Sequence, residues 1–528
     1  MLRFIPFLLI ALIGFVACKN GAAKPELSTR DTSINLSNSV TVLFFDSTRM
    51  EAFIAKEKPG DSIALAMRSF YNERNYQMAW FDTTGLTEHA LSFLQAQQQY
   101  ISYSRDSSIY DQRLQVLSDI LESDSTDVPI DSSLRLSTEL LLTCSFFRYA
   151  QAAYEGQRSL NLKDLGWYIP RKKIDLRQLL DSIFVSGSAK LSEYDPVNRQ
   201  YRRLKKHLLE YYELEKNHSW EPLQAPKTSL KPGDNSELVP VIRERLVALG
   251  DLAAVDSSLT IDDTLTLAIK RFQRRHGLSE DGVMGAGFFA QLNISPAQRI
   301  RQLLVNMERL RWVPAANPKD YLLINIPAYQ LFIYRNDSLD WSMDVVVGST
   351  AHNTVIFRGD LKYIVFSPYW NVPKSIVRNE IEPALKKNSN YLEKNNMERY
   401  TGGIRQKPGP DNSLGLVKFL FPNNYNIYLH DTPAKSLFGR DQRAFSHGCI
   451  RLAEARKLAY YLLRDNPKWT PENIERAMAG KKETWVTLPQ TLPVFIGYFT
   501  AWESSEGLLQ FRNDVYGHDK KLADRLFQ

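Results

Sequence analysis

The sequence predicts a multidomain α+β protein with an α-helical N-terminal region, a small three-helix unit and a mainly β C-terminal domain that carries a helical insertion. At 528 residues the chain has room for about three domains. Apolar residues recur at helical spacing through residues 41–293, whereas alternating, strand-like runs dominate after residue 320. A linker at 224–237, with two prolines and several turn residues, separates the two helical regions.

The composition is that of an ordinary globular protein, and it argues against several classes of function. Hydrophobic residues make up 44% and charged residues 24% of the chain, so each domain can bury a core. The net charge is +7, but lysine and arginine are spread among acidic residues without a long basic block. We therefore expect no nucleic-acid partner, while a weak attraction to anionic polymers or membrane surfaces stays open. The three cysteines form no CxxC pair, which argues against a zinc ribbon or a redox motif.

The first 18 residues, MLRFIPFLLIALIGFVAC, have the features of an export signal. Arg3 precedes an apolar run, 4–17, that is short for a helix crossing a bilayer. The final FVAC resembles a bacterial lipobox, in which Cys18 would be lipidated and become the mature N-terminus, although Phe15 stands where leucine is usual. An ordinary signal peptide and a short uncleaved anchor are the alternatives. In each case the rest of the chain is expected outside the cytoplasm.

Residues 19–40 predict a flexible tether, because serine, threonine, asparagine and alanine dominate them. Residues 41–222 predict a helical scaffold domain, with long amphipathic or apolar runs such as 134–156 and 203–216. Cys144 lies inside the apolar run, so we interpret it as a buried structural thiol. No cluster of reactive side chains stands out in this region.

Residues 234–295 predict a compact three-helix unit. Leu238, Ile242, Leu246 and Leu249 share one face of its first helix, which ends at Gly250. The text AIKRFQRRHGLSEDGVMGAGFFAQL resembles the peptidoglycan-binding domain of cell-wall enzymes, whose usual text is a helix ending in F-Q, then G-L, then D-G-x-x-G. A generic three-helix bundle is the alternative. The resemblance implies glycan binding or a spacer role, and we assign no ligand residues here.

Residues 296–528 predict a mainly β domain. A helix at 299–312 precedes a strand pair around Pro327 and further strands at 341–349 and 362–370. The charged, helix-prone excursion at about 372–420 is expected to cross a sheet end as a cap. A strand-rich segment near the C-terminus is expected to complete the sheet.

Reactive side chains concentrate in residues 425–452. The run YNIYLH (425–430) alternates as a strand, which puts Tyr428 and His430 on one face. A helical pattern at 452–465 places Cys449 at or just before a helix N-terminus. Such a position and a neighbouring imidazole would both stabilise the thiolate, which is the nucleophilic form of cysteine.

The turn Ser446-His447-Gly448-Cys449 supplies the other groups that acyl transfer needs. Gly448 permits a tight turn, and the amides of Gly448 and Cys449 can face a reacting carbonyl oxygen. His430 is favoured as the base over His447, because it approaches from a separate strand; His447 would then support the turn by hydrogen bonding. Asp431 would hold the other imidazole nitrogen by its side chain or its carbonyl.

A zinc site made by the two histidines and Cys449 is possible by ligand type. Nucleophilic use fits an exported chain with one such thiol better. We therefore expect neither a metal nor a cofactor.

His430, fifteen residues, and then SHGCIR together resemble the active-site motif of L,D-transpeptidases with the YkuD-like fold. In that family a histidine is followed, after a loop of similar length, by Ser/Thr-His-Gly-Cys, a hydrophobic residue and Asn or Arg. The scaffold region, the peptidoglycan-binding text and WNVPKSI at the start of the cap further resemble the large Gram-negative, YcbB-like type. One departure is local: GSTAHNTVIF (348–357) lacks the proline often seen after its glycine turn.

The resemblance implies that Cys449 attacks the carbonyl between the third and fourth residues of a tetrapeptide stem, releasing D-alanine and leaving a thioacyl-enzyme. A side-chain amine of a second stem then gives a 3→3 cross-link, and carbapenem-type inhibitors would acylate Cys449. Trp370, Tyr428 and Arg451 are candidates for the donor site, although core aromatics and a helix-start ion pair would explain them equally well.

The location that fits this reading is the periplasm of a Gram-negative bacterium, with the chain as a membrane-anchored lipoprotein. Two alternatives stay open: an L,D-carboxypeptidase that uses water as acceptor, and a catalytically silent wall-binding lipoprotein.

Overall fold

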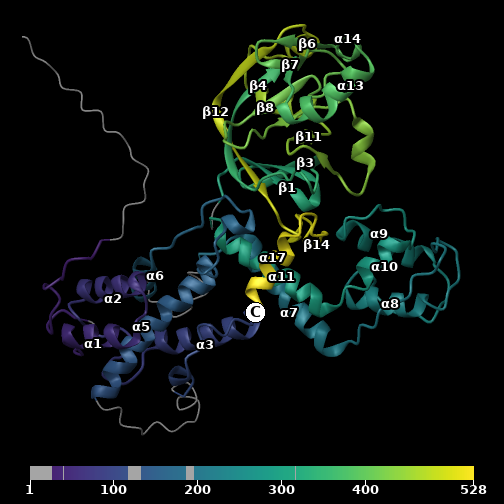
Figure 1. Ribbon diagram of the computed structural model, residues 1–528. Coiled ribbons are helices and arrows are strands. Elements are labelled where there is room, and N and C mark those ends of the chain that lie inside the picture. The colour runs from purple at the N-terminus through teal and green to yellow at the C-terminus, as the bar shows by residue number, and fades with distance from the viewer. Residues whose placement is uncertain (1–25, 40, 117–131, 186–195, 315–316, 528) are drawn as a thin grey trace, which may run out of the picture. The chain divides into compact units, whose positions relative to one another are not determined.

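A computed structural model describes residues 26–39, 41–116, 132–185, 196–314 and 317–527, and it confirms the predicted α+β fold class (Figure 1). The chain forms two compact units and passes between them several times. The first unit comprises Met1–Leu94, Gln112–Arg148 and Leu176–Ala189, and the second comprises the rest. The predicted signal peptide and lipobox at 1–18 lie outside the described residues. Among the described helices, none has both the length and the apolar composition to cross a membrane.

The first unit is helical. Its helices are α1 (Ser47–Glu57), α2 (Asp61–Glu73), α6 (Leu176–Val185) and the parts of α3 (Glu88–Ser104) and α5 (Ser132–Glu155) that fall within its bounds. Buried Glu139 of α5 accepts hydrogen bonds from the amides of Ala79 and Trp80 and from the Tyr71 hydroxyl. A single carboxylate thus fastens the loop after α2 onto α5. Cys144 is fully buried, as expected for a structural thiol.

Residues 26–39, the described part of the segment predicted as a flexible tether (19–40), make hydrogen bonds with the end of α2 and the residues after it. The Asp31 amide donates to the Asn72 carbonyl, and the Asn72 side chain donates to the Ser28 carbonyl. The Asn75 side chain donates to the Ile34 carbonyl. The main chain of this segment therefore provides hydrogen-bond partners for Asn72 and Asn75, at the end of α2.

The helical region at 41–222 does not coincide with one compact unit. Its last helix, α7 (Arg199–Asn217), belongs to the second unit and packs along α11 (Pro296–Trp312). Amphipathic periodicity shows that a helix has an apolar face, but it does not show which neighbour covers that face.

The predicted three-helix unit is present as α8 (Val239–Ala248), α9 (Asp263–Arg275) and α10 (Ala286–Leu292) around a separate apolar core. The Gln273 side chain donates to Asp281 and accepts from the Gly282 amide. Gly282 has a φ of +76°, in the left-handed region that favours glycine. These contacts explain why glutamine and the Asp-Gly pair occur together in the sequence motif.

The C-terminal domain contains one large sheet, with the order β10-β3-β11-β9-β8-β4-β12-β1-β2 within the described residues. Its strands are β1 (Tyr321–Asn325), β2 (Gln330–Arg335), β3 (Ser338–Gly348), β4 (Arg358–Phe366), β8 (Val417–Leu420), β9 (Leu429–His430), β10 (Ala444–Ser446), β11 (Ile450–Leu452) and β12 (Thr484–Gly497). Because β3 also pairs with β2, the sheet closes on itself around a buried apolar core. The predicted strand pair around Pro327 is confirmed as β1 and β2, joined by a short turn.

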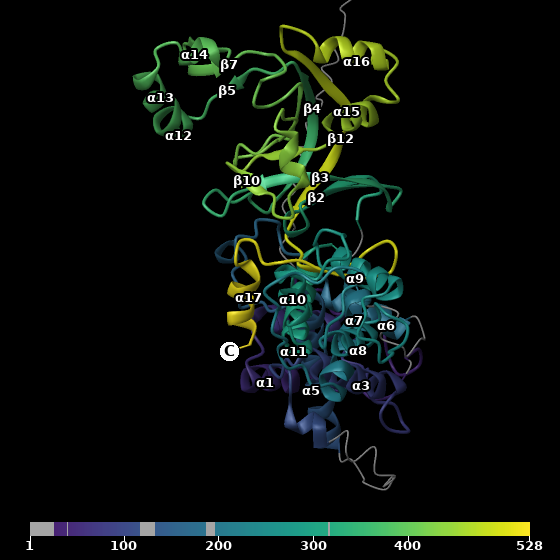
Figure 2. The same ribbon diagram turned by 90° about the vertical axis from the view of Figure 1, so that its right-hand side faces the viewer.

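The predicted cap is a small subdomain with its own core of Val372, Ile376, Ile381 and Ile404. It contains β5 (Trp370–Asn371), α12 (Lys374–Ile376), a π-helical turn (Val377–Ile381), α13 (Glu382–Lys387), α14 (Tyr391–Lys394), β6 (Met397–Tyr400) and β7 (Gly403–Gln406). Figure 2 shows the cap on one side of β4 and β12, and α15 (Ala455–Leu463) and α16 (Pro471–Met478) on the other.

The chain ends beyond the large sheet in β13 (Ala501–Glu503), β14 (Leu509–Phe511) and α17 (His518–Leu526). The C-terminal segment was predicted to be strand-rich and to complete the sheet. The strand that does so is β12, which pairs with β4 and β1. His518 at the start of α17 is partly buried against the rings of Tyr498 and Tyr516.

Candidate active site

The cysteine turn joins β10 to β11, and both strands pair with β3. Ser446 closes the turn on itself: its hydroxyl accepts from the Gly448 amide at 3.1 Å and donates to the Cys449 carbonyl at 2.5 Å. Gly448 has a φ of +109°, which a residue with a side chain would adopt only under strain. The turn is therefore held by its own serine and glycine.

The expectation that Cys449 begins a helix is wrong. Cys449 is followed by β11, and α15 begins only at Ala455. A helix dipole acts over about one turn, so α15 does not stabilise a thiolate at Cys449. Burial raises the pKa of the Cys449 thiol, and contacts with Tyr428 offset part of that rise. The resting side chain is therefore a neutral thiol.

Of the two amides predicted to form an oxyanion site, one is already engaged in another hydrogen bond. The Gly448 amide is already bonded to the Ser446 hydroxyl. The Cys449 amide has no hydrogen-bond partner among the residues that the structure describes. Only this second amide is free to receive an oxyanion.

His430 lies on β9, directly beside the strand that follows the cysteine. The parallel pairing of β9 and β11 sets His430 opposite Arg451. Buried His430 donates from Nδ1 to the backbone carbonyl of Asp431 at 2.6 Å. A carbonyl only accepts, so Nδ1 carries the proton and Nε2 keeps its lone pair. Burial lowers the pKa of His430 to about 4, so the imidazole is neutral near pH 7 and can accept a proton.

The question about Asp431 is decided by these contacts. Its backbone carbonyl accepts a hydrogen bond from the His430 imidazole, whereas its carboxylate accepts from the Leu416 amide and the Lys435 ammonium. Asp431 therefore orients His430 through the main chain.

His447 is directed towards the cap. Its side chain is 48% exposed, and its Nε2 lies 3.5 Å from a carboxylate oxygen of Glu380 in the π-helical turn. Its ring also lies 4.9 Å from the ring of His352. The hydrogen bonds that close the cysteine turn come from Ser446, so the supporting role expected for His447 belongs to that serine.

Comparisons with known proteins identify the family of three parts of the chain. Residues 319–486 match the family model of the L,D-transpeptidase catalytic domain, of the YkuD type. The chain carries an L,D-transpeptidase catalytic domain. Residues 65–208 match a model described as "Scaffold domain", and residues 235–292 match one described as "Putative peptidoglycan binding domain".

Individual relatives carry the same description. A Haemophilus influenzae protein described as "Putative L,D-transpeptidase" is 31% identical over 243 residues, which cover 42% of this chain and 49% of that protein. The match thus spans about half the length of this curated relative. A solved L,D-transpeptidase from Xylanimonas cellulosilytica is 14% identical, with 52% of this chain and 99% of that chain covered and a TM-score of 0.19. One from Stackebrandtia nassauensis is also 14% identical, with coverage of 52% and 98% and a TM-score of 0.22.

Within the L,D-transpeptidase domain, the strand predicted at 425–430 is only partly present. Regular pairing is limited to Leu429 and His430, because the Asn423 side chain accepts from the Tyr425 and Ile427 amides and makes a turn there. Asn426 follows with a φ of +55°, and its carbonyl lies 3.5 Å from the Cys449 Sγ. The thiol therefore donates to a backbone carbonyl that sequence reasoning did not single out.

The three candidates for the donor site have different surroundings. Tyr428 is next to the thiol, and burial raises its pKa, so its hydroxyl stays protonated. Arg451 interacts electrostatically with Cys449; burial lowers the pKa of its guanidinium, and its buried Nε has no hydrogen-bond partner among the described residues. Trp370 instead belongs to the cap, where it packs against the core that includes Val372. Trp370 is therefore a core aromatic of the cap, which was one of the alternatives. The other alternative, an ion pair at a helix start, is wrong for Arg451, because Arg451 lies on β11.

No group of three His, Cys, Asp or Glu side chains within the described parts of the chain is arranged to hold a metal ion. The catalytic domain does have one supporting contact that sequence reasoning missed. The hydroxyl of Thr354 donates to the Gly448 carbonyl across 94 positions of sequence. No spacing rule connects these two residues, because β3 and the loop after it bring them together.

Proposed function

We propose that this L,D-transpeptidase domain forms 3→3 peptidoglycan cross-links through a thioacyl-enzyme on Cys449, using tetrapeptide stems as donors and releasing D-alanine. The pairing of β9 with β11 supports this above all, since it holds a neutral imidazole, protonated at Nδ1, beside the cysteine turn. A nucleophile, an oriented base and a free amide are the parts that acyl transfer requires.

In the first half-reaction the thiol proton moves to Nε2 of His430 as Sγ attacks the carbonyl carbon of the third stem residue. The oxyanion forms a hydrogen bond with the Cys449 amide, and loss of such a donor typically costs about 10²–10³ in rate. The C–N bond to D-alanine then breaks, and His430 returns the proton to the departing amine. Because thiol and imidazole are both neutral at rest, the thiolate is formed during the attack.

In the second half-reaction the side-chain amine of another stem attacks the thioester. His430 takes a proton from that amine, the C–S bond breaks, and the thiol is restored. Water in place of the amine would release a tripeptide instead. The cap contacts the cysteine turn through Glu380 and His447, so it is suited to exclude water from the thioester.

Arg451 is suited to the donor stem. A partly buried guanidinium that interacts electrostatically with Cys449, and whose Nε has no hydrogen-bond partner among the described residues, binds an anionic group more strongly than one exposed to water. The stem presents carboxylates on both sides of the bond that breaks. We therefore assign to Arg451 a carboxylate of the donor, and to Tyr428 a place in the wall around it.

The rest of the proposal concerns location. The export signal at 1–18 and the lipobox-like FVAC favour a lipoprotein held at a membrane through Cys18, in the periplasm of a Gram-negative bacterium. The match to a peptidoglycan-binding domain fits a chain that works on the wall polymer.

The purified full chain should be incubated with disaccharide-tetrapeptide, and the products separated and weighed. We expect 3→3 dimers together with free D-alanine. Tripeptide without dimers would mean a carboxypeptidase, and no product would mean a silent wall-binding protein. A carbapenem should add its mass to the wild type and not to Cys449→Ala; an equal adduct on both would refute the thiol nucleophile.

A further inference from the structure

We propose that Tyr516, near the C-terminus, is a positioning residue for the cysteine turn, acting through the loop 348–354. The inference rests on the proposed function, because it concerns how the acyl-transfer turn is held. Tyr516 also lies beyond the 319–486 segment that matches the catalytic-domain family. The proposal therefore extends the functional machinery to the C-terminal segment of the chain.

The loop 348–354 contacts both ends of the cysteine turn. The Ser349 amide donates to the Ser446 carbonyl at 2.8 Å, and the Thr354 hydroxyl donates to the Gly448 carbonyl at 2.8 Å. Thr354 is 1% exposed, so water does not replace this second bond. The position of Gly448, and with it the Cys449 amide, therefore depends on where Thr354 lies.

The loop is closed tightly at its base. The Gly348 amide donates to the Thr354 hydroxyl at 2.8 Å, which makes that hydroxyl both an acceptor within the loop and a donor to the turn. A Cβ on Gly348 would lie 2.1 Å from the His352 carbonyl oxygen. No side chain fits at position 348, so the backbone of His352 packs directly against the backbone of Gly348.

Tyr516 connects the two ends of this loop. Its hydroxyl donates to the Gly348 carbonyl at 2.6 Å and accepts from the Thr354 amide at 3.3 Å. Burial raises the pKa of Tyr516 to about 12, so the hydroxyl remains a donor at any pH at which the wall is built. The Tyr516 hydroxyl thus sets the distance between Gly348, at the end of β3, and Thr354, which donates to the Gly448 carbonyl.

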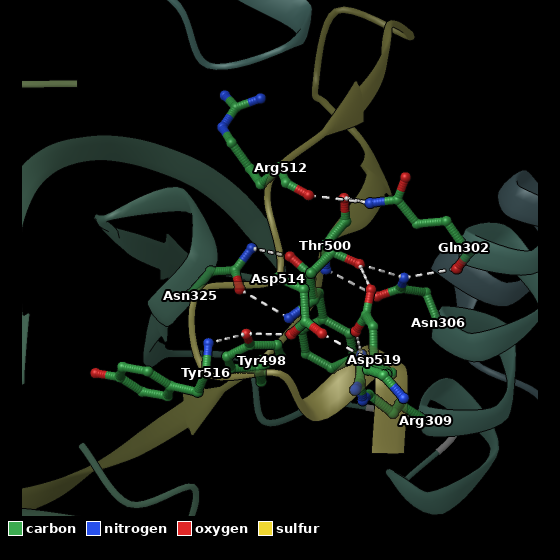
Figure 3. A network of polar contacts seen from close by, with 12 residues as sticks. Gln302, Asn306, Arg309, Asn325, Tyr498, Thr500, Arg512, Asp514, Tyr516 and Asp519 are labelled. Carbon is green, nitrogen blue, oxygen red and sulfur yellow. Dashed lines mark hydrogen bonds and ion pairs between the residues drawn. The ribbon is translucent and has the colours of Figure 1, made fainter. Parts of the chain in front are cut away.

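Tyr516 is itself positioned by a hydrogen bond of its main chain, as Figure 3 shows. Its amide donates to the Tyr498 hydroxyl at 2.8 Å, and that hydroxyl donates to Asp514 at 2.6 Å. Further along, Asp519 accepts from Thr500 and from Arg309 of α11. The C-terminal segment is therefore a polar brace between α11 and the loop beside the active site.

Acylation and alkylation of Cys449 separate positioning from general support. Alkylation by iodoacetamide needs only the thiolate, whereas acylation by a carbapenem also needs the Cys449 amide in place. Misplacement by about 1 Å can cost 10²-fold in rate. We expect Tyr516→Phe to lower the acylation rate constant about ten- to a hundredfold, while alkylation of the Cys449 peptide at high pH is unchanged.

Three variants serve as controls. Tyr321→Phe removes the hydroxyl of another buried tyrosine, one on β1 that accepts from the Asn317 side chain, and should acylate like the wild type. Thr354→Val should reproduce the loss seen with Tyr516→Phe, and Thr354→Ser should restore it, because serine keeps the hydroxyl. If Tyr516→Phe fails to fold, this threonine pair gives the same test.

The double variant Tyr516→Phe/Thr354→Val decides whether the two residues act as one brace. Its loss should equal that of the more affected single variant; losses that multiply would overturn the proposal. Wild-type acylation rates in Tyr516→Phe, or an equal fall in acylation and alkylation, would overturn it as well. A wild type that forms no adduct would instead refute the proposed function, and the inference with it.

Discussion

Asp431 meets His430 through its backbone carbonyl, at 2.6 Å from Nδ1, while its carboxylate bonds to the Leu416 amide and to Lys435. The site therefore orients its histidine with a main-chain acceptor rather than with an acidic third member. A carbonyl fixes the tautomer, but it does not stabilise an imidazolium as a carboxylate would. This agrees with a His430 that stays neutral at rest.

Asp431→Asn should therefore keep most of its activity. The amide oxygen of asparagine can still accept from the Leu416 amide, and the Asp431 carbonyl is unchanged. We expect carbapenem acylation within about threefold of the wild type and a loss of about 1 kcal/mol in the free energy of unfolding. His430→Gln is the matched control and should abolish acylation. A loss of about 10⁴ in Asp431→Asn, as for an acid that orients a catalytic histidine, would contradict the assignment.

The low pKa of His430 has a predicted effect on stability. Its folded-state pKa is about 4, against 6.5 for the ordinary group, so between these values the unfolded chain binds the extra proton. Stability should then fall as the pH drops from about 6.5 towards 4, by at most about 1.4 kcal/mol per pH unit for this one group. His430→Gln should show a shallower fall in chemical denaturation across that range. Equal slopes in the two proteins would mean that His430 is not buried as a neutral base.

Arg451→Met should separate substrate binding from folding. Removing a partly buried guanidinium whose Nε has no hydrogen-bond partner among the described residues should leave the free energy of unfolding unchanged or raise it. The lost hydrogen bonds to a carboxylate should raise KM for the tetrapeptide about ten- to a hundredfold, with a smaller change in kcat. Arg451→Lys, which keeps the charge without the planar fork, should lie between. A KM like that of the wild type in Arg451→Met would refute the donor-site assignment.

Ser446→Ala should disturb the cysteine turn. The variant leaves the Gly448 amide and the Cys449 carbonyl without their partner, which costs about 1–3 kcal/mol in the free energy of unfolding. It also allows the Gly448 amide to turn away, so we expect slower acylation. Ser446→Thr keeps the hydroxyl and should recover both properties. Stability and acylation unaffected in Ser446→Ala would show that the turn is held by other contacts.

Lipidation at Cys18 is tested by phase partitioning of the protein expressed in a bacterium with an outer membrane. The wild type should enter the detergent phase, because a lipid chain adds about 0.8 kcal/mol of membrane affinity for each buried CH₂. Cys18→Ser should remain in the aqueous phase, and Cys144→Ser, which alters the buried thiol, should behave like the wild type. Unchanged partitioning of Cys18→Ser would refute the lipobox.

Several features were predictable because they depend on short stretches of chain. The three helices at 239–292 and the strand pair around Pro327 were correctly predicted from periodicity and turn residues. Predictions failed where a side chain competed with the regular pattern. Asn423 bonds to two following amides and shortens the strand before His430, and β11 takes the place of the helix start expected after Cys449.

The sequence by itself determined which reactive groups the protein has and in what order they occur: a histidine, a loop, and a serine, glycine and cysteine in one turn. The tertiary structure alone decided how these groups are connected. It set the Asp431 carbonyl on Nδ1, bound the Gly448 amide to Ser446, and brought Thr354 and Tyr516 behind the turn. The reason is physical, since a hydrogen bond acts over about 3 Å. Its partner is known only once strand register and packing have brought distant residues together.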